Sequence, residues 1–338
     1  MLRLVGILLT VGAAILVAIA TWPQFFRLER TFPFAQVVAM RPAMVVALAV
    51  LFVLALALCL IRPMRGFAAS IAIVALVGAV AGGGILLSRG TGSSTLPAKG
   101  EGALRVMTWN TAGAATDPAL IARTAVAMQA DVVALPETTI ETGERVAVAM
   151  REMGSPMWAH HEAFPGWAAN STTLLISPSL GAYAVIESVS AGTSNTTTVP
   201  TVVAMPVSGD GPTIVAAHAL APRYDDMESW RTSLTWLGDQ CASADVIMAG
   251  DFNASVDNLA RLGVDGGDLG RCHDAAAATG SGAVGTWSTA WPALVGASID
   301  HVLATDAWTP TGSVVLASLD DSGSDHRPLV VQLQRTAP

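Results

Sequence analysis

The stretch VIMAGDFN, at residues 246–253, is a short apolar run that ends in Gly, Asp, Phe and Asn. A short apolar run followed by turn-forming residues is typical of a strand that is buried on both faces of a sheet. We therefore predict a strand at residues 245–249, with Asp251 and Asn253 in the loop after it. Loops at strand ends are where a rigid α/β scaffold usually presents its catalytic groups.

The same pattern of short apolar runs, interrupted by segments of helical periodicity, continues over residues 104–333. Further strands are predicted at residues 104–109, 131–135, 172–176, 183–187, 199–207, 213–217, 298–304, 313–317 and 328–333. Helices are predicted at residues 118–129, 142–153 and 225–241. Short buried strands mixed with helices indicate layered α/β packing.

Polar side chains stand at the ends of many of these predicted strands. They are Asn110, Glu137, His218, Asp251, Asn253, Asp300, Asp325 and His326. Taken singly, a strand-end Asp or Asn is more often a turn or cap residue, and a lone histidine is more often structural. Because so many of them occur in one chain, each attached to a strand, we expect them to form one catalytic site.

The motifs that carry these residues occur in one order along the chain. They are TWN at residues 108–110, LPE at 135–137, HALAP at 218–222, GDFN at 250–253, SIDH at 298–301 and SDHRP at 324–328. This order resembles the endonuclease/exonuclease/phosphatase superfamily over residues 104–334, and GDFN with a later SDHRP is its most specific part. The resemblance implies a DNase I-like fold, a four-layer α/β sandwich, for a catalytic domain at residues 103–338.

The resemblance also implies a site for Mg²⁺ or Mn²⁺. Glu137 resembles the principal carboxylate ligand, Asn110 the asparagine that supports the metal site, and Asp325 a carboxylate at or beside the metal. Mg²⁺ prefers oxygen ligands and keeps several waters, so that one or two carboxylates suffice. The spacings of cysteine and histidine indicate no zinc site. A glutamine often precedes the metal-binding glutamate in the family, and Pro136 stands there in this chain.

For the reaction itself, the resemblance gives a role to each remaining motif residue. Asp251 resembles the group that orients or deprotonates the attacking water, and Asn253 the amide that holds a phosphate oxygen. His326 resembles the histidine that contacts the scissile phosphate, Asp300 its carboxylate partner, and His218 a second phosphate-facing histidine. A cation and hydrogen-bond donors of this kind stabilise the charge of a phosphodiester under attack.

Two further residues are expected near the substrate. Thr286, in the motif GTWS, resembles a substrate-facing threonine of the family, and Arg223 is the nearby candidate for a phosphate-binding arginine after His218. His301 replaces an aromatic residue that is common in the family, and we expect it to pack structurally. Structural roles are also expected for the histidines outside the motifs, His160, His161 and His273.

The charge distribution bears on the substrate. Residues 1–102 hold eight of the 18 basic residues and two of the 26 acidic ones, so that residues 103–338 hold ten and 24. A domain with a net charge near −14 lacks the basic footprint that duplex-DNA binding usually leaves. We therefore expect no tight binding of duplex DNA, and we favour small or lipid phosphate esters over duplex DNA.

The first part of the chain reads as a transmembrane region, residues 1–87. Three uncharged apolar stretches lie there, at residues 4–22, 43–61 and 66–87. As helices, each is about long enough to cross a hydrocarbon layer of about 30 Å. A Gly/Ser-rich segment at residues 88–102 is expected to be a flexible linker to the catalytic domain.

These stretches predict a multi-pass protein of the cell membrane with an extracytoplasmic catalytic domain. Residues 1–20 also fit a cleaved signal peptide, which would leave the domain on the same side. Arginines flank the spans on both sides, so that the positive-inside rule favours neither orientation strongly. In an exported domain Cys241 and Cys272 can form a disulfide, and two separate buried thiols are the alternative.

These features together predict a membrane-anchored, metal-dependent phosphoesterase. Its expected substrate is a phosphodiester of nucleic acid or of a phospholipid head group, hydrolysed by metal-assisted attack of water. A phosphomonoesterase or inositol-phosphate phosphatase on the same fold is an alternative, although the domain has few basic residues for a multiply charged substrate. A catalytically silent surface-binding protein is a third hypothesis.

Overall fold

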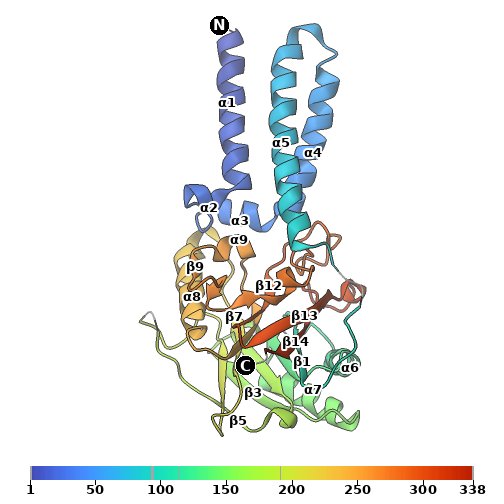
Figure 1. The fold of residues 1–338 in the computed structure, drawn as a ribbon, viewed down its shortest axis with the longest axis vertical. Helices are drawn as coiled ribbons and strands as arrows, with labels where there is room; N and C mark the ends of the chain where they lie inside the picture. The colour runs from blue at the N-terminus through green and yellow to red at the C-terminus, as the bar shows by residue number, and fades with distance from the viewer. Residues whose placement is uncertain (1, 93–94, 114, 191, 337–338) are drawn as a thin grey trace.

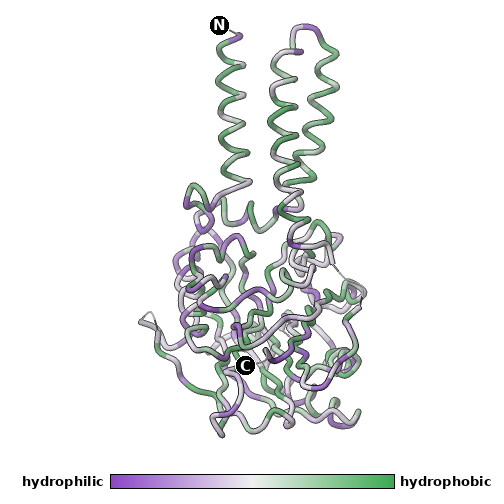
Figure 2. The backbone as a smooth tube through the Cα atoms, in the orientation of Figure 1, coloured by the Kyte–Doolittle hydropathy of each residue, from purple (hydrophilic) through white to green (hydrophobic). Residues whose placement is uncertain are grey.

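The computed structural model describes residues 2–92, 95–113, 115–190 and 192–336. A group of long helices forms one end of the molecule, and an α/β domain forms the other (Figure 1). The helices are almost uniformly hydrophobic, whereas hydrophobic and hydrophilic segments alternate in the domain (Figure 2). This contrast is the one that the composition of the two parts predicts.

Three of the helices cover the three apolar stretches. The helical part consists of α1 (Leu2–Thr21), α2 (Pro23–Phe26), α3 (Phe34–Ala39), α4 (Arg41–Leu58), η1 (Arg62–Met64) and α5 (Arg65–Arg89). Helices α1, α4 and α5 are long and apolar enough to cross a membrane. Successive long helices run in opposite directions. The short helices α2 and α3, which connect α1 to α4, therefore lie at the end that faces the α/β domain (Figure 1).

Residues 88–102 are expected to be a flexible linker, but the part of this segment that the structure describes makes ordered contacts with the domain. Its first two residues belong to α5, which ends at Arg89. Beyond the helix, the backbone N–H of Gly92 donates to the carbonyl of Gly280 at 2.9 Å, and the ammonium of Lys99 pairs with Asp131 at 2.7 Å. Residues 93–94 lie outside the described residues. The described part therefore packs on the domain.

The domain is built on two six-stranded mixed sheets. The first has the order β13-β14-β1-β2-β4-β3, and the second has the order β11-β12-β8-β7-β6-β5. The strands of the first sheet are β1 (Ala103–Thr108), β2 (Val132–Pro136), β3 (Trp158–Ala163), β4 (Ser171–Ile176), β13 (Trp308–Val315) and β14 (Leu329–Arg335). Those of the second are β5 (Tyr183–Val185), β6 (Val202–Pro206), β7 (Thr213–His218), β8 (Val246–Asp251), β11 (His273–Asp274) and β12 (Asp300–Ala304).

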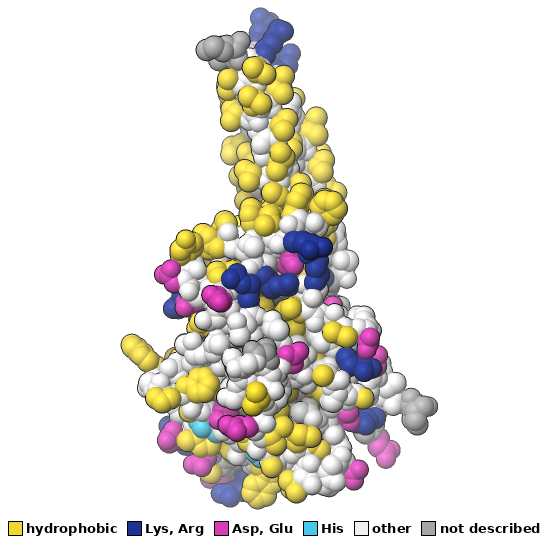
Figure 3. Space-filling model, turned by 90° about the vertical axis from the view of Figure 1, so that its left-hand side faces the viewer, with side chains coloured by type: hydrophobic (Ala, Val, Ile, Leu, Met, Phe, Trp, Pro, Cys, Tyr) yellow, Lys and Arg dark blue, Asp and Glu magenta, His cyan; other side chains and the backbone are white. Residues whose placement is uncertain are grey.

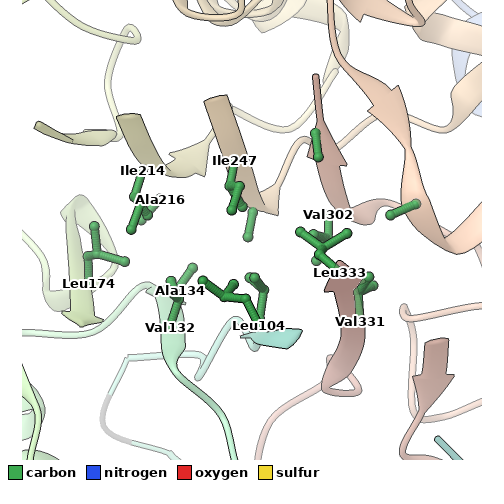
Figure 4. Packing of buried hydrophobic residues seen from close by; sticks show 14 of the residues in the cluster. Leu104, Val132, Ala134, Leu174, Ile214, Ala216, Ile247, Val302, Val331 and Leu333 are labelled. Carbon is green, nitrogen blue, oxygen red and sulfur yellow. The ribbon is translucent and has the colours of Figure 1, made fainter. Parts of the chain in front are cut away.

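The two sheets pack face to face, and helices cover their outer faces. Inward-facing Ala, Val, Leu and Ile side chains of both sheets meet in one core (Figure 4). Helices α6 (Pro118–Ala127) and α7 (Ile140–Glu152) cover the first sheet, and α8 (Met227–Gln240) covers the second. This arrangement confirms the predicted four-layer α/β sandwich.

Short elements complete the domain. They are the helices α9 (Val256–Leu259) and α10 (Ala275–Ala278), the strands β9 (Leu262–Gly263) and β10 (Leu269–Gly270), and the 3-10 turns η2 (Ala168–Asn170), η3 (Pro178–Leu180), η4 (Tyr224–Asp226) and η5 (Ala317–Leu319). Cys241, after α8, forms a disulfide with Cys272, before β11. The structure thus favours the disulfide over two separate thiols.

Two edge strands differ from the sequence prediction. Strand β3, with the sequence WAHHEA, was not predicted, because its polar residues are tolerated at an edge that remains half-exposed. Strand β13 begins at Trp308 rather than at residue 313, and its register shifts between Pro310 and Gly312. Proline is compatible with an edge strand at such an irregularity.

Candidate active site

Three central strands of the second sheet bring three of the predicted site residues together. In the parallel pair β7–β8, His218 lies opposite Asp251, and in the antiparallel pair β8–β12, Asp251 lies opposite Asp300. The ends of β7 and β8 and the start of β12 therefore meet at one edge of this sheet.

The first sheet repeats this arrangement at the facing edge. Strands β1 and β2 are parallel and end just before Asn110 and Glu137, and the antiparallel β14 begins just after His326. The side-chain amide of Asn110 donates to Glu137 Oε1 at 3.1 Å and to Asp251 Oδ2 at 3.0 Å. This amide joins the two sheets across the site.

His326 is held between two carboxylates. Its Nδ1 lies 2.9 Å from Asp300 Oδ2, and its Nε2 lies 3.8 Å from Asp251 Oδ2. Burial alone would lower the pKa of His326, but the negative charges of Asp300 and Asp251 outweigh it and raise the pKa to about 10. The ring is therefore a cation at neutral pH and can face an anionic phosphate.

His218 has the opposite electrostatic character. Its side chain is 3% exposed, and burial, with the nearby positive charge of His326, lowers the pKa of His218 to about 3. Its Nε2 lies 4.0 Å from Glu137 Oε1. Its Nδ1 has no hydrogen-bond partner among the described residues. A neutral imidazole in this position can donate one hydrogen bond without adding charge.

Asp251 is placed to accept a proton. Its Oδ1 accepts from the backbone N–H of Asn253 at 2.8 Å, and its Oδ2 accepts from the Asn253 amide at 3.2 Å. Burial, and after it the negative charge of Asp300, raise the pKa of Asp251 to about 7. A base with a pKa near the working pH is suited to proton transfer. The Asn253 amide also donates to the carbonyl of Ala219 at 2.9 Å, which fixes the loop after β7.

The site carries an excess of carboxylates that fits a divalent cation. Burial raises the pKa of Glu137, against the hydrogen bond from Asn110 and the positive charge of His326, and the negative charges of Asp325 and Asp300 add to the increase. Asp251 and Asp300 also lie in a group with His326 whose ligand atoms are within 4.8 Å of one another, and in this group the protonated ring is the partner of the two carboxylates. A bound cation would relieve this repulsion, and oxygen donors of this kind are those that Mg²⁺ and Mn²⁺ accept.

The backbone conformation just after strands β2 and β8 also bears on the site. Glu137 and Asn253 both have positive φ, 55° and 46°. Such a conformation is uncommon for a residue with a side chain, and it occurs in tight turns, including those that present functional groups. The carboxylate of Glu137 and the amide of Asn253 thereby reach the site from tight turns.

Three of the predicted residues lie behind this cluster, at its rim or outside it. Thr286 is 1% exposed, and its hydroxyl accepts from the backbone N–H groups of Ile299 and Asp300 at 3.2 and 3.1 Å. It therefore positions the start of β12 rather than facing the substrate. Asp325 is exposed and accepts from the indole N–H of Trp287 at 2.9 Å. The Arg223 side chain is exposed, and no described polar contact joins it to the cluster.

The structure adds residues that sequence reasoning did not single out. The hydroxyl of Ser324 donates to the carbonyl of Asn110 at 2.6 Å and accepts from the N–H of His326 at 3.0 Å. The buried guanidinium of Arg327 pairs with Asp320 at 2.7 Å. Both residues lie in the SDHRP motif, which was the available signal. His301, expected to be structural, is buried against Asp274.

Comparisons with known proteins agree with this geometry. The model of the Endonuclease/Exonuclease/phosphatase family matches residues 107–326. A solved endonuclease/exonuclease/phosphatase from Beutenbergia cavernae DSM 12333 is 20% identical, with a TM-score of 0.51, over 70% of this chain and 72% of that chain. D. rerio TDP2, complexed with a single-strand DNA product, is 17% identical, with a TM-score of 0.52, over 69% of this chain and 100% of that chain. At these identities the two structures show a shared fold. No match is found among curated proteins.

Proposed function

The chain belongs to the endonuclease/exonuclease/phosphatase family, and on that premise we propose that it is a metal-dependent phosphoesterase anchored in the cell membrane. The observation that carries the proposal is the pairing of a cationic His326 with Asp300, beside an Asp251 whose pKa is about 7. A fold alone does not determine function, so that the proposal rests on this site.

Each side chain of the site has a task in the hydrolysis of a phosphate ester. Asp251 accepts a proton from the attacking water, and Asn110 holds its carboxylate in place. The imidazolium of His326 binds a non-bridging phosphate oxygen, and Asp300 maintains its charge and orientation. The ring of neutral His218 donates to the phosphate as negative charge develops. The two N–H groups of the Asn253 amide bind Asp251 and the Ala219 carbonyl, so that this amide holds the base in place rather than a phosphate oxygen.

Glu137, with Asp325 beside it, would hold the metal ion. A bound Mg²⁺ or Mn²⁺ supplies Lewis-acid stabilisation of the phosphoryl oxygens. The Asn110 amide orients Glu137 through one carboxylate oxygen and leaves the other for a ligand role. The elevated pKa of Glu137 supports a site that is electrostatically incomplete without a cation.

We propose phosphodiesters as the substrate class. His326 and His218 can donate to one phosphate group, whereas the acidic domain disfavours substrates that carry many negative charges. Residues 103–338 hold ten basic and 24 acidic residues, which disfavours duplex DNA and multiply charged inositol phosphates alike. Single-stranded nucleic acid remains a candidate, since D. rerio TDP2 has been solved with a single-strand DNA product.

The charges at the two ends of the helices support an extracytoplasmic domain. Arg3, Arg62 and Arg65 lie at the end of the helices that is remote from the domain, which becomes the cytoplasmic side. On the domain side, Arg41 and Arg89 pair with Asp257, and Arg30 donates to the carbonyls of Asn258 and Ala260. These three arginines therefore have a structural reason for their position, and Arg27 lies on the same side. The disulfide is also typical of an oxidising compartment.

A substrate panel tests the proposal. The full chain in detergent would be assayed with Mg²⁺ or Mn²⁺, and with EDTA, against single-stranded DNA and RNA, plasmid DNA, phospholipids, inositol phosphates and bis(p-nitrophenyl) phosphate. We expect hydrolysis of a diester that EDTA abolishes and that Asp251→Asn removes. Full activity in EDTA would disprove the metal requirement, and better hydrolysis of monoesters would favour the phosphatase alternative.

A further inference from the structure

The helical part and the catalytic domain are joined by a buried ionic cluster around Asp257. Arg41, at the start of α4, binds this carboxylate through Nε at 3.1 Å and Nη2 at 2.9 Å. Arg89, at the end of α5, binds both carboxylate oxygens at 2.8 Å. The side-chain amide of Gln24, in α2, donates to the same carboxylate. The domain-side ends of the helices are thus fixed to one point of the domain.

The segment between α1 and α4 is also part of the domain's core. Ala35 of α3 is 1% exposed and packs in the same hydrophobic cluster as Ala219 and Phe252. The amide of Asn258, in α9, donates to the carbonyls of Glu29 and Ala35 at 2.7 and 3.3 Å. The orientation of the domain relative to the helices is therefore fixed by packing and not left to a flexible tether.

These contacts lie directly beside the active site. Ala219 follows His218, and Phe252 follows Asp251, so that the hydrophobic cluster that includes Ala35 of α3 extends to two catalytic loops. The loop after His218 also contacts the helical part through Gln36, whose amide donates to the carbonyl of Pro222.

Chain length limits how far the site can lie from the membrane. Asp251 and Asp257 are separated by six peptide units, which span at most about 21 Å even when fully extended. The polar head groups occupy a further layer of about 5–8 Å on each side of the hydrocarbon. Because Asp257 binds the ends of two membrane-length helices, Asp251 lies no more than about 21 Å from a residue that is fixed to the domain-side ends of these helices.

The surface at this junction has the character of a membrane interface. Space filling shows Lys and Arg side chains gathered where the helices meet the domain (Figure 3). Arg30, Arg231 and Arg261 are close enough to interact electrostatically, with the Glu29 carboxylate among them. Exposed aromatic side chains lie at residues 22–32, and they are Trp22, Phe25, Phe26 and Phe32, while the exposed Tyr224 of the domain contacts the last of them.

One of these aromatic pairs connects the interface to the active-site loop. The rings of Phe32 and Tyr224 are 5.2 Å apart and nearly perpendicular, and Tyr224 is 72% exposed. Aromatic and basic side chains together are characteristic of the head-group region, where the basic ones attract anionic lipids. In a domain with 24 acidic and ten basic residues, such a basic cluster marks a specific surface.

We infer that the substrate is a membrane phospholipid, whose phosphodiester bond is hydrolysed. The lipid comes from the leaflet on the domain side of the membrane. This inference rests on the proposed function and names its substrate class. The junction arginines draw anionic head groups to the interface, and the rigid attachment keeps the catalytic residues close to the membrane surface. A soluble phosphodiester gains nothing from either feature.

The test compares lipid with soluble substrate in the full chain. The protein would be reconstituted into vesicles of phosphatidylglycerol and phosphatidylethanolamine with Mg²⁺. The soluble counterparts would be glycerophosphoglycerol and glycerophosphoethanolamine, with bis(p-nitrophenyl) phosphate as a general substrate. We expect kcat/KM for the lipid to exceed that for its soluble counterpart at least tenfold.

Variants of the junction sharpen this test. The double substitution Arg231→Gln and Arg261→Gln should lower lipid hydrolysis several-fold and leave hydrolysis of bis(p-nitrophenyl) phosphate unchanged. Arg151→Gln, on α7, removes an exposed arginine far from the junction and should change neither rate. Phe25→Ser removes an aromatic side chain that is 82% exposed and no charge. It should also lower lipid hydrolysis and leave hydrolysis of bis(p-nitrophenyl) phosphate unchanged.

Two outcomes would overturn the inference in different ways. Hydrolysis of soluble diesters that equals or exceeds that of lipid would overturn the lipid assignment and leave the proposed function intact. Absence of hydrolysis for every ester, with the protein folded, would overturn the proposed function and the inference with it.

Discussion

Two buried clusters of charged side chains, one around Asp257 and one around Asp251, shift the pKa of their central carboxylate in opposite directions. At Asp257 two arginines surround one carboxylate, and although burial would raise the pKa of Asp257, its ion pairs with Arg89 and Arg41 lower it. At Asp251 the neighbouring Asp300 adds negative charge, and the pKa of Asp251 rises to about 7. The two carboxylates are equally buried, and only their neighbours differ.

This difference separates a structural cluster from a functional one. The carboxylate of Asp257 is saturated by donors from three helices, so that it needs no ligand. The cluster at Asp251 keeps unsatisfied groups, among them Asp300 Oδ1 and His218 Nδ1, which have no partner among the described residues. Buried polar atoms that lack partners, next to a carboxylate whose pKa is raised, are a mark of sites that bind a cation or a substrate.

The largest effect is expected at the active site. Asp251→Asn and His326→Ala should each lower kcat on bis(p-nitrophenyl) phosphate by about 10²–10⁴-fold, the usual range for loss of a positioned acid or base. Asp251→Asn should change the midpoint of thermal unfolding little, because it removes a charge that Asp300 repels. His326→Ala should lower the midpoint, because the buried Asp300 loses its partner. Asp306→Asn, at a side chain that is 89% exposed, is the matched control. Unchanged turnover in a folded Asp251→Asn protein would remove its role.

The junction should show the reverse pattern. Asp257→Asn leaves Arg41 and Arg89 without a counter-charge, and loss of one partner from a buried ion pair costs about 3–5 kcal/mol. Thermal unfolding in detergent should detect the loss, while kcat on the soluble diester stays near that of the native protein. Asp265→Asn, which removes an exposed carboxylate 3.8 Å from Arg271, controls for the substitution itself. Equal midpoints in the two variants would refute the structural role of Asp257.

The disulfide should contribute next. It closes a loop with a sequence separation of 31 residues, and removing such a link costs about 2–4 kcal/mol. The double variant Cys241→Ser and Cys272→Ser should therefore unfold at lower temperature in oxidising buffer and match the native protein under reducing conditions. Cys59→Ser, at a free cysteine, should have no effect. An equal loss under reducing conditions would indicate packing instead of the covalent bond.

A smaller effect on catalysis is expected from Thr286, which positions Asp300. Thr286→Val removes the acceptor for two buried N–H groups, and we expect kcat to fall about tenfold, which corresponds to about 1.4 kcal/mol. KM should remain nearly constant, because Thr286 does not face the substrate. Thr286→Ser keeps the hydroxyl and should restore most of kcat. A rise in KM alone would instead support the substrate-facing role expected from sequence.

The smallest effect concerns pH. The folded-state pKa of Asp257 is lowered, so that its contribution to stability is complete above the unfolded-state pKa of about 3.9 and is lost as pH falls below it. The difference in unfolding free energy between the native protein and Asp257→Asn should be constant from pH 7 to about pH 4.5 and shrink at lower pH. A difference that shrinks as pH rises would contradict this sign.

The sequence predicted the fold and the residues of the cluster because both depend on local patterns. The apolar run before Asp251 predicts a buried strand, and the polar residues at strand ends mark the edge where the site forms. The register of a strand and the burial of a side chain depend on contacts between segments that are distant in the sequence. Thr286 was expected to face the substrate, and only the packing of β12 places its hydroxyl behind Asp300.

The junction was beyond local reasoning for the same reason. Asp257 has no motif, and its partners Gln24, Arg41 and Arg89 are 168 to 233 residues away along the chain. The segment at residues 88–102 was read as a linker from its composition, since Gly and Ser do not reveal that a segment packs on the domain. Contacts of this range are set by tertiary structure alone.

Binding of Mn²⁺, followed by electron paramagnetic resonance, tests most directly whether the acidic site is built for a cation. The native protein and Asp306→Asn should bind Mn²⁺ in a manner that Mg²⁺ displaces, and Glu137→Gln should weaken this binding at least tenfold. Equal Mn²⁺ binding in the native protein and Glu137→Gln, or no binding in either, would contradict the account of the excess carboxylates as a metal site.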